Sequence, residues 1–457
     1  MAKAWFISGL TQRWLSDSVG FSITTRNDCV WEPRFTRELQ ERAIRTRIVL
    51  RPYSLLEGKP EMKIAIVVQG RLWAFDMARA LSERGHQVSL FTNYPVWAAR
   101  RFGVGSAEVR SFWPHGVATR LAEHLGINAE SALHTAFGQW AAKEISRGSW
   151  DVIHCWSGVS LELLQAHGNS RGTTILARGS THIRTQARIL EEEERRTGVP
   201  LDRPSKWMIA REEKEYALAD RIVVLSHFTY DSFVWEKIPP DKLGLVPLGA
   251  DCRAFRPSPE IVEQRCQRIL QGHPLRVMHV GTVCFRKGMW DAAEIIRSVG
   301  IERYRFKFVG AMLRETKGLV TELRGLAQFI PKQPQHELVN HYAWADVFFA
   351  PTLEDGFQIV LGQVGASALP ILTTTNGAGP DLVKEGQTGW VLPIRSPRTF
   401  VERLHWCDTH REELAAMVHH LYKHYQPRDW SDVAFDFERM CQDIIVPSNV
   451  SAAAKVT

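Results

Sequence analysis

The residues best suited to chemistry lie in one short stretch, Pro351–Gln363, which combines acidic, glycine and amide residues. The segment Ala345–Ala350 before it has the composition of a buried strand, and a helix is predicted to begin after Gly356. Ligands of parallel α/β sheets bind at the carboxyl ends of strands, where free N–H groups at helix starts attract anions. The stretch is therefore a candidate binding site for a phosphorylated ligand.

Each part of this stretch suits a different part of a phosphorylated sugar. The carboxylates of Glu354 and Asp355 suit sugar hydroxyls, and Gln363, about 12 Å further along the helix axis, suits a ribose. The amides expected to hold a phosphate are those of Gly356, Phe357, Gln358 and Ile359. An Asp-Gly pair is also ordinary turn chemistry, so the stretch alone does not establish a site.

A second candidate loop, Gly281–Gly288, follows another predicted strand and carries Thr282, Arg286 and Lys287. Two adjacent cations beside a strand end suit a pyrophosphate, and the glycines allow its close approach. Taken alone, an Arg-Lys pair is more often a solvated surface pair. The loop is therefore a candidate site only in combination with Pro351–Gln363.

The first half of the chain contributes three further candidates. His182 follows a predicted strand that ends at Ala177, and Arg178 stands directly after that strand, where it could meet an anionic group. A lone histidine in this place is more often structural than ligand-binding. Gly70 follows the first predicted strand and leaves room for a nucleotide to approach the backbone.

The elements that must position these residues are short apolar segments that alternate with amphipathic helices, which is the pattern of parallel sheets covered on both faces. The predicted strands are Ile64–Val68, Val88–Thr92, Trp150–Cys155, Thr174–Ala177 and Ala219–Leu225, followed by Leu275–Gly281, Arg305–Gly310, Ala345–Ala350, Pro370–Thr373 and Gly389–Leu392. The Pro-rich segment Val246–Pro259 separates the two series. We therefore expect an α/β fold with two Rossmann-like domains that face each other across a cleft.

The expected domain boundaries follow from these segments. Residues 62–252 form the first domain and residues 253–430 the second, with a helix at 431–446 that packs back toward the first domain and a mobile tail at 447–457. Residues 1–61 are interpreted either as an extension, with Met62 as an alternative start, or as a capping subdomain. The charge runs Glu191–Arg196 and Glu212–Glu215 are interpreted as solvated helix faces.

Taken together and in this order, the motifs resemble those of the retaining GT-B glycosyltransferases of family 4. The resemblance runs from Met62 to about Ile445. Further motifs that carry it are Leu81–Val88, Ala219–Ser226, Val246–Asp251 with Phe255–Pro257, Tyr342–Asp346, Gly377–Gly379 and Glu385–Gly389. The resemblance implies a GT-B architecture, with the acceptor side in residues 62–252 and the donor-binding side in residues 253–430.

The sequence departs from the family pattern at four positions. Asp355 and Gln363 stand where the family has its two glutamates, Thr282 stands at or near the place of an arginine, and Gly70 replaces a Gly-Gly pair. Asp355 keeps its carboxylate with a shorter reach. Gln363 loses the charge that roughly doubles the strength of a hydrogen bond, so we expect a weaker ribose contact.

The resemblance implies transfer of a sugar from a nucleotide-sugar, a UDP- or GDP-sugar, to a hydroxyl of a glycan, lipid or small-molecule acceptor. It implies retention of configuration by front-face attack, with Lys287, Arg286 and the helix start stabilising the pyrophosphate in place of a metal. His182 and Asp355 would contact the sugar, and Lys287 would be essential to transfer. The sequence contains no D-x-D motif, so no metal or other cofactor is expected.

Composition excludes several other classes of protein. The 457 residues are 44% apolar and 23% charged, and the apolar runs are too short to span a membrane. The seven cysteines form no C-x-x-C pair, which favours the cytoplasm. The net charge of +7 permits peripheral contact with an anionic membrane at its inner face, and no nucleic-acid partner is expected.

Two other functions remain open from the sequence. The departures at Thr282 and Gln363 are compatible with a catalytically weak or silent protein that binds nucleotide sugars. A GT-B-shaped epimerase of nucleotide sugars is the second alternative. The absence of a Gly-x-Gly-x-x-Gly motif after the first strand counts against a dinucleotide oxidoreductase.

Overall fold

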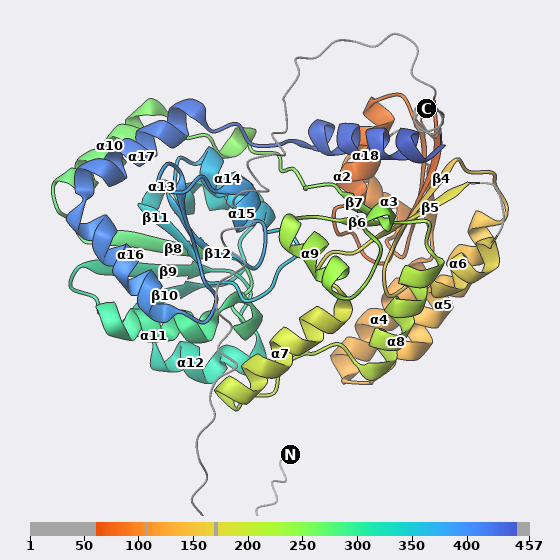
Figure 1. The fold of residues 1–457 in the computed structure, drawn as a ribbon, viewed down its shortest axis with the longest axis horizontal. Helices are drawn as coiled ribbons and strands as arrows, with labels where there is room; N and C mark the ends of the chain where they lie inside the picture. Colours follow the sequence, from red (N-terminus) through yellow and green to blue (C-terminus); the bar gives the residue numbers. More distant parts are fainter. Residues whose placement is uncertain (1–60, 106–107, 169–171, 446–457) are drawn as a thin grey trace, which may run out of the picture. The chain divides into compact units, whose positions relative to one another are not determined.

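The computed structural model describes residues 61–105, 108–168 and 172–445, all of which belong to one unit, Pro60–Thr457. The sequence interpretations of residues 1–60 and of the tail at 447–457 lie outside the described residues. Within the described part, the chain forms two parallel sheets flanked by helices (Figure 1).

The first sheet has seven strands in the order β3-β2-β1-β4-β5-β6-β7. Its strands are β1 (Lys63–Val68), β2 (Gln87–Thr92), β3 (Glu108–Ser111), β4 (Val152–Trp156), β5 (Thr173–Ala177), β6 (Arg221–Val224) and β7 (Leu243–Leu245). The central strand β1 pairs in parallel with β2 and β4 on its two sides, so that Val67 aligns with both Phe91 and Cys155. A strand paired on both edges and covered on both faces must be apolar, as the sequence of β1 is.

The second sheet has six parallel strands in the order β10-β9-β8-β11-β12-β13. Its strands are β8 (Leu275–Val280), β9 (Tyr304–Val309), β10 (Ala327–Ile330), β11 (Val347–Ala350), β12 (Ile371–Thr374) and β13 (Gly389–Leu392). The neighbours β8 and β11 stand where the strand order reverses, with Phe348 aligned to Met278. Ligands of open α/β sheets bind beyond the carboxyl ends of strands at such a reversal. The loops after β8 and β11 are the two candidate loops of the sequence.

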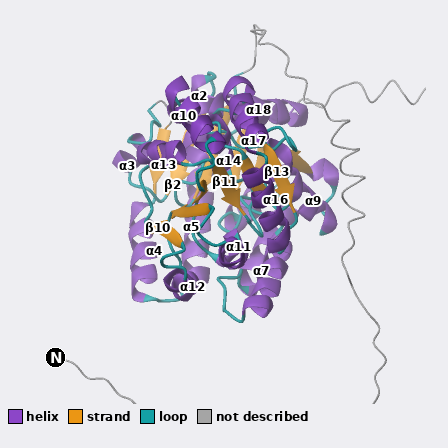
Figure 2. Ribbon diagram, turned by 90° about the vertical axis from the view of Figure 1, so that its left-hand side faces the viewer, coloured by secondary structure: helices purple, strands orange, loops and turns teal. Residues whose placement is uncertain are grey.

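Helices cover the faces of the sheets, and the strands lie inside them (Figure 2). In the first half they are α2 (Ala74–Glu83), α3 (Val96–Arg100), α4 (Trp113–Leu125), α5 (Glu130–Ile145), α6 (Leu161–His167), α7 (Ile183–Thr197), α8 (Lys206–Leu218) and α9 (His227–Trp235). In the second half they are α10 (Pro259–Leu270), α11 (Met289–Val299), α12 (Lys317–Glu322), α13 (Leu338–Trp344), α14 (Ile359–Ala366), α15 (Gly379–Leu382), α16 (Pro397–Thr409) and α17 (Arg411–His424). Their apolar faces explain this arrangement: in α2, the buried residues Ala74, Ala78 and Leu81 recur at helical spacing. No helix in the described part of the chain is long and apolar enough to cross a membrane.

The last described helix, α18 (Trp430–Ile445), packs against α2. Its side chains Phe437 and Cys441 are fully buried in the core around the first sheet. The guanidinium of Arg84, at the end of α2, donates to Glu438 of α18. Residues from the end of the chain therefore complete the core of the first sheet (Figure 1).

The charge run Glu191–Arg196 is only in part a solvated face: Glu191 and Arg195 are exposed, but the interpretation was wrong for Glu193. Glu193 is fully buried and accepts hydrogen bonds from Arg395 (3.0 Å) and Arg196 (3.3 Å). Arg196 also pairs with Asp291 of α11. The partners Arg395 and Asp291 come from distant parts of the chain, so the pattern within one helix gave no sign of them.

The second charge run, Glu212–Glu215, is solvated only at Lys214 and in part at Glu213, and the interpretation was wrong for Glu212 and Glu215, which are buried. The carboxylate of Glu215 accepts hydrogen bonds from the backbone N–H groups of Gly158 and Ser160, in the loop after β4. Burial, and then the charge of Glu212, raise the pKa of Glu215 to about 8 against these hydrogen bonds. This face of α8 holds the loop after β4 in place.

Candidate functional site

The loop after β8, Gly281–Gly288 (the basic loop), lies directly against the loop after β11, Pro351–Gln358 (the acidic loop). The backbone N–H of Leu353 donates to the carbonyl of Arg286 at 3.0 Å. Gly288 has φ +79°, and a Cβ there would stand 1.8 Å from the carbonyl oxygen of Pro351. Only a glycine fits at this approach, so the two loops are held together by their backbones.

The side chains of the two loops form two ion pairs. Lys287 pairs with Asp355, and Arg286 Nη1 donates to Glu354 Oε2 at 3.2 Å and to the Glu354 carbonyl at 3.0 Å. Burial opposes the charge on Arg286, but the carboxylates of Glu354 and Asp355 outweigh it and raise its pKa. The structure thus brings together the adjacent cations and adjacent acids that the sequence singled out.

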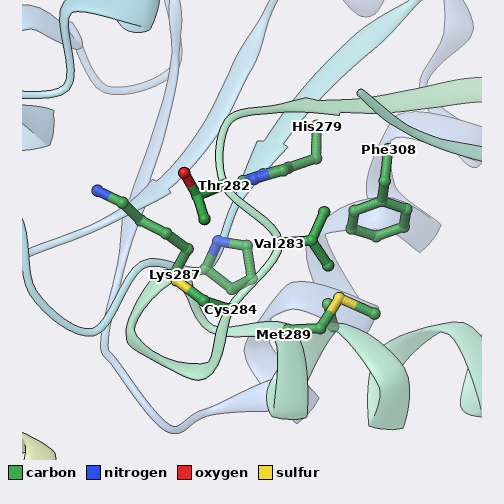
Figure 3. A pocket seen from close by; sticks show the side chains of 9 residues that line it. His279, Thr282, Val283, Cys284, Lys287, Met289 and Phe308 are labelled. Carbon is green, nitrogen blue, oxygen red and sulfur yellow. The ribbon is translucent and has the colours of Figure 1, made fainter. Parts of the chain in front are cut away.

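The basic loop covers a small crevice under the end of β8 (Figure 3). The hydroxyl of Thr282 and the amine of Lys287 point to one side of it, while Val283 and Phe308 line the other (Figure 3). His279, on β8, is buried beneath the loop, and burial lowers its pKa to about 4. The polar side of the crevice is therefore made by Thr282 and Lys287.

Helix α14 begins at Ile359, after the acidic loop, with Gln358 as its capping residue. The side-chain oxygen of Gln358 accepts the N–H of Ala378 at 2.9 Å. In the part of the chain that the structure describes, the N–H groups of Gly356, Phe357 and Gln358 have no protein acceptor. Of the four amides predicted to hold a phosphate, these three are unpaired, whereas Ile359 N–H donates to the Phe357 carbonyl.

Gln363 lies one turn into α14 and is half-buried. Its amide oxygen accepts the hydroxyl of Tyr342 at 3.0 Å. The predicted ribose contact would therefore use the Nε2 donor of Gln363 and share its oxygen with Tyr342. No sequence pattern pointed to Tyr342 as a partner of Gln363.

The carboxylate of Glu354 is fully buried and bonded to residues of the first half of the chain. Its Oε1 accepts hydrogen bonds from the Ser180 hydroxyl and from both N–H and hydroxyl of Thr181 (each 3.0 Å), and its Oε2 accepts from Gln186 (3.2 Å). Burial would raise the pKa of Glu354, but Arg286 and then the hydrogen bonds from Ser180 and Thr181 lower it to about 2. A donor could contact Glu354 only by displacing these partners.

His182 lies two residues after Ser180 and caps the start of α7. Its Nδ1 accepts the N–H of Arg184 at 3.3 Å, and its ring packs against Tyr216 and Phe233. Burial lowers the pKa of His182 to about 4, so the ring is neutral at pH 7. Since Nδ1 is the acceptor, the proton of the neutral ring lies on Nε2.

Arg178 is committed to protein partners rather than standing open to an anion. It forms an ion pair with Glu212 at 2.8 Å and donates to Gln186 at 2.9 Å and to the Tyr216 hydroxyl at 3.2 Å. Burial opposes its charge, but Glu212 and Tyr216 outweigh it and raise its pKa above its ordinary value.

Gly70 lies in an open turn after β1. Its φ is +83°, and nothing stands within 4 Å of a Cβ built there, so the space beside it is free for a ligand. Its N–H donates to Asn93 at 2.8 Å, and its carbonyl accepts the hydroxyl of Thr92 at 3.0 Å. The end of β2 thus fixes the position of this turn.

Sequence reasoning missed the residues that hold the site together. Ser180 and Thr181 stand between Arg178 and His182, so the motif pointed to their loop but not to their role. Gln186 carried no signal, because its partner Glu354 lies 168 positions away. Within the described residues, no group of three or more His, Cys, Asp or Glu side chains is placed to hold a metal ion.

Two family models match the chain. One, described as Glycosyltransferase Family 4, matches residues 72–254, and one described as Glycosyl transferases group 1 matches residues 274–407. Together the two models cover more than half of the chain. They include every candidate site residue except Gly70.

Curated relatives are similar over part of their length. A D-inositol 3-phosphate glycosyltransferase from Corynebacterium glutamicum is 24% identical over 230 residues, which are 46% of this chain and 54% of that protein. The amylovoran biosynthesis glycosyltransferase AmsK from Erwinia amylovora is 21% identical over 190 residues, 39% of this chain and 45% of that protein. The chain spans about half the length of the curated relatives it matches.

Solved GT-B structures share the fold. Anabaena Alr3699/HepE in complex with UDP has a TM-score of 0.59 at 14% identity, covering 84% of this chain and 100% of that one. Sucrose-phosphate synthase from Thermosynechococcus elongatus has a TM-score of 0.62 at 15% identity, covering 85% of this chain and 100% of that one. The two parallel sheets and the two family models agree, and the chain belongs to the GT-B glycosyltransferases that join a Family 4 domain to a group 1 domain.

Proposed function

We propose that this protein is a retaining glycosyltransferase that moves a sugar from a nucleotide-sugar to a hydroxyl of a glycan, lipid or small-molecule acceptor. The observation that carries the proposal is the pairing of Arg286 and Lys287 with Glu354 and Asp355 at the carboxyl ends of β8 and β11. Cations and carboxylates side by side suit a ligand with a pyrophosphate at one end and sugar hydroxyls at the other. Residues 253–430 would bind this donor, and residues 62–252 would bind the acceptor.

In the proposed reaction, the acceptor oxygen bonds to the anomeric carbon as the bond to the leaving phosphate breaks. The leaving phosphate takes the acceptor's proton on the same face, which retains the configuration. Negative charge grows on the pyrophosphate, and Lys287, Arg286 and Thr282 would stabilise it together with the unpaired N–H groups of Gly356, Phe357 and Gln358. Preorganised donors of this kind act without reorganisation at the moment of reaction.

The sugar would be oriented by groups from both halves of the chain. Asp355, which pairs with Lys287, would exchange this partner in part for sugar hydroxyls. His182 would donate from Nε2 as a neutral ring, since its pKa lies near 4. The turn at Gly70 would let a phosphate or sugar approach the backbone, and Gln363 Nε2 would reach the ribose.

The donor is proposed to be a UDP- or GDP-sugar. The solved structure of Anabaena Alr3699/HepE with UDP-glucose has this fold, which supports a uridine nucleotide as the first donor to test. The name of the corynebacterial relatives makes D-inositol 3-phosphate one acceptor to include. The proposal requires neither a metal nor a redox cofactor.

The direct test is a transfer assay with UDP-, GDP- and ADP-sugars and a panel of hydroxyl acceptors. The expected result is acceptor-dependent release of the nucleoside diphosphate, with NMR showing that the product keeps the donor's anomeric configuration. Binding of a donor without turnover would instead identify a silent nucleotide-sugar-binding protein. A donor isomerised without an acceptor would identify an epimerase.

A further inference from the structure

The carboxylate of Glu354 joins the acidic loop to residues that lie far away in the sequence. Ser180 and Thr181 stand 174 and 173 positions earlier, between β5 and α7, and Gln186 lies within α7. A buried carboxylate is costly unless hydrogen-bonded, and Glu354 reaches zero exposure only because these donors and Arg286 surround it. The contact is therefore specific to this pair of loops.

The neighbouring carboxylates Glu354 and Asp355 have different surroundings. Asp355 is partly exposed and has Lys287 as its ion-pair partner. Glu354 has four donors from the loop Arg178–His182 and α7, and its Oε2 also binds Arg286. A carboxylate offers about four lone-pair sites, so Glu354 has no capacity left for a sugar.

A series of hydrogen bonds and ion pairs connects Glu354 to helix α8, which packs in the half of the chain that holds the first sheet. Gln186, which donates to Glu354, accepts from Arg178 at 2.9 Å, and Arg178 is paired with Glu212 at 2.8 Å. Glu212 is buried on α8, so the chain ends in a fixed element. A rigid anchor of this kind transmits the position of Glu354 to the loop that carries His182.

The backbones of the two loops also meet. A Cβ added at Gly356 would stand 2.1 Å from the carbonyl oxygen of Gly179, a distance that no side chain tolerates. Thr181 is followed directly by His182, and the His182 N–H is held by the Ser232 hydroxyl at 2.9 Å. Because Glu354 binds both Arg286 and Thr181, it determines where His182 lies relative to Arg286.

We propose that Glu354 is a positioning residue, which docks the loop Arg178–His182 onto the acidic loop and so sets Arg286 and His182 in the arrangement that donor binding needs. This inference rests on the proposed function and replaces the sequence-based role of Glu354 as a donor ligand. Because a donor binds only the docked arrangement, weakening the dock raises the apparent dissociation constant of the donor in inverse proportion to the fraction of molecules that stay docked.

The test measures donor KM, kcat and the thermal unfolding midpoint of four proteins: wild type, Q186L, E354Q and the exchange variant E354Q/Q186E. Q186L removes one donor from the dock without touching Arg286, and we expect donor KM to rise about tenfold, as loss of a hydrogen bond to a charged group would give. E354Q turns an acceptor toward Gln186 and Arg286 into a donor, and we expect a larger rise. The exchange variant again places a hydrogen-bond donor opposite an acceptor at positions 354 and 186. We therefore expect its KM for the nucleotide-sugar to be lower than that of E354Q, and as low as that of Q186L or lower.

The matched control is Q328L, at an exposed position on β10, which leaves donor KM within twofold of wild type. An inactive wild type would contradict the proposed function itself. An active wild type with unchanged donor KM in Q186L, whatever its unfolding midpoint, would overturn the positioning role alone. If Q186L does not fold, an exchange variant no better than E354Q overturns it equally.

Discussion

At the residue scale, the environment of each side chain determines what it can do. Histidines illustrate this most directly, because His154, His182 and His279 all have pKa values lowered to about 4, chiefly by burial. None of them is a cation at neutral pH. In the site, positive charge comes from Arg286 and Lys287, and His182 offers a neutral N–H donor.

The buried histidines predict how stability depends on pH. For His154, the folded pKa of about 4 lies below the ordinary value of 6.5, so the unfolded chain binds more protons between these values. The free energy of unfolding should therefore rise as pH increases from 4.5 to 6.5 and level off above it. H154Q removes the uptake of about one proton on unfolding, so it should reduce the slope of the unfolding free energy against pH by ~1.4 kcal/mol per pH unit.

The measurement is urea unfolding at several pH values between 4.5 and 8. H273Q, which replaces an exposed histidine, serves as the control. Equal slopes for wild type and H154Q would show that folding does not lower the pKa of His154.

At the element scale, the loops after β8 and β11 depend on close backbone contact. Gly288 against Pro351 and Gly356 against Gly179 are two places where a side chain has no room. These contacts join the basic loop, the acidic loop and the loop before α7 into one assembly. A change at either glycine should therefore affect both stability and activity.

The variant G356A tests this assembly. Its Cβ would stand 2.1 Å from the Gly179 carbonyl, so we expect a loss of about 1–3 kcal/mol in the free energy of unfolding and a fall in transfer activity. G318A, on α12 with no heavy atom within 4 Å of the new Cβ, should be neutral or slightly stabilising. Equal unfolding midpoints for the two variants in a thermal scan would contradict the account.

The strands found by sequence reasoning are the buried ones, and those it missed lie at sheet edges. β1, from Ile64 onward, and β11 are continuous apolar runs, which suits a parallel strand covered on both faces. The unpredicted strands β3, β7 and β10 all end a sheet, and no residue in them is fully buried. An edge strand pairs on one side only, so it has less need of an apolar sequence.

The residues of the candidate site also fall into two groups, those that could be predicted from the sequence and those that could not. Arg286, Lys287, Glu354 and Asp355 could be found because each pair lies directly after a buried strand. The partners of Glu354 could not be found, because Ser180, Thr181 and Gln186 meet it only through the tertiary fold. The same limit explains why the buried residues Glu193 on α7 and Glu212 and Glu215 on α8 were wrongly assigned to solvent.

At the scale of the whole molecule, the net charge says less about the ligand than the positions of individual charged side chains do. Of the net charge of +7, residues 1–61 contribute +3 through ten basic and seven acidic residues. The basic residues that matter to the proposal are two, Arg286 and Lys287, and both are already paired with carboxylates. A donor pyrophosphate would therefore compete with Asp355 for Lys287, which makes this lysine the critical residue of the account.

The most direct measurement compares nucleotide-sugar turnover by wild type, K287A and K332A, at saturating acceptor. Lys332 is exposed on a surface loop, so K332A is matched in chemistry and should turn over at the wild-type rate. K287A should keep its thermal unfolding midpoint within a few degrees and lose at least a hundredfold in turnover, as removal of one charge-stabilising donor does in other enzymes. Turnover by K287A at the wild-type rate would contradict the assignment of the basic loop as the donor site.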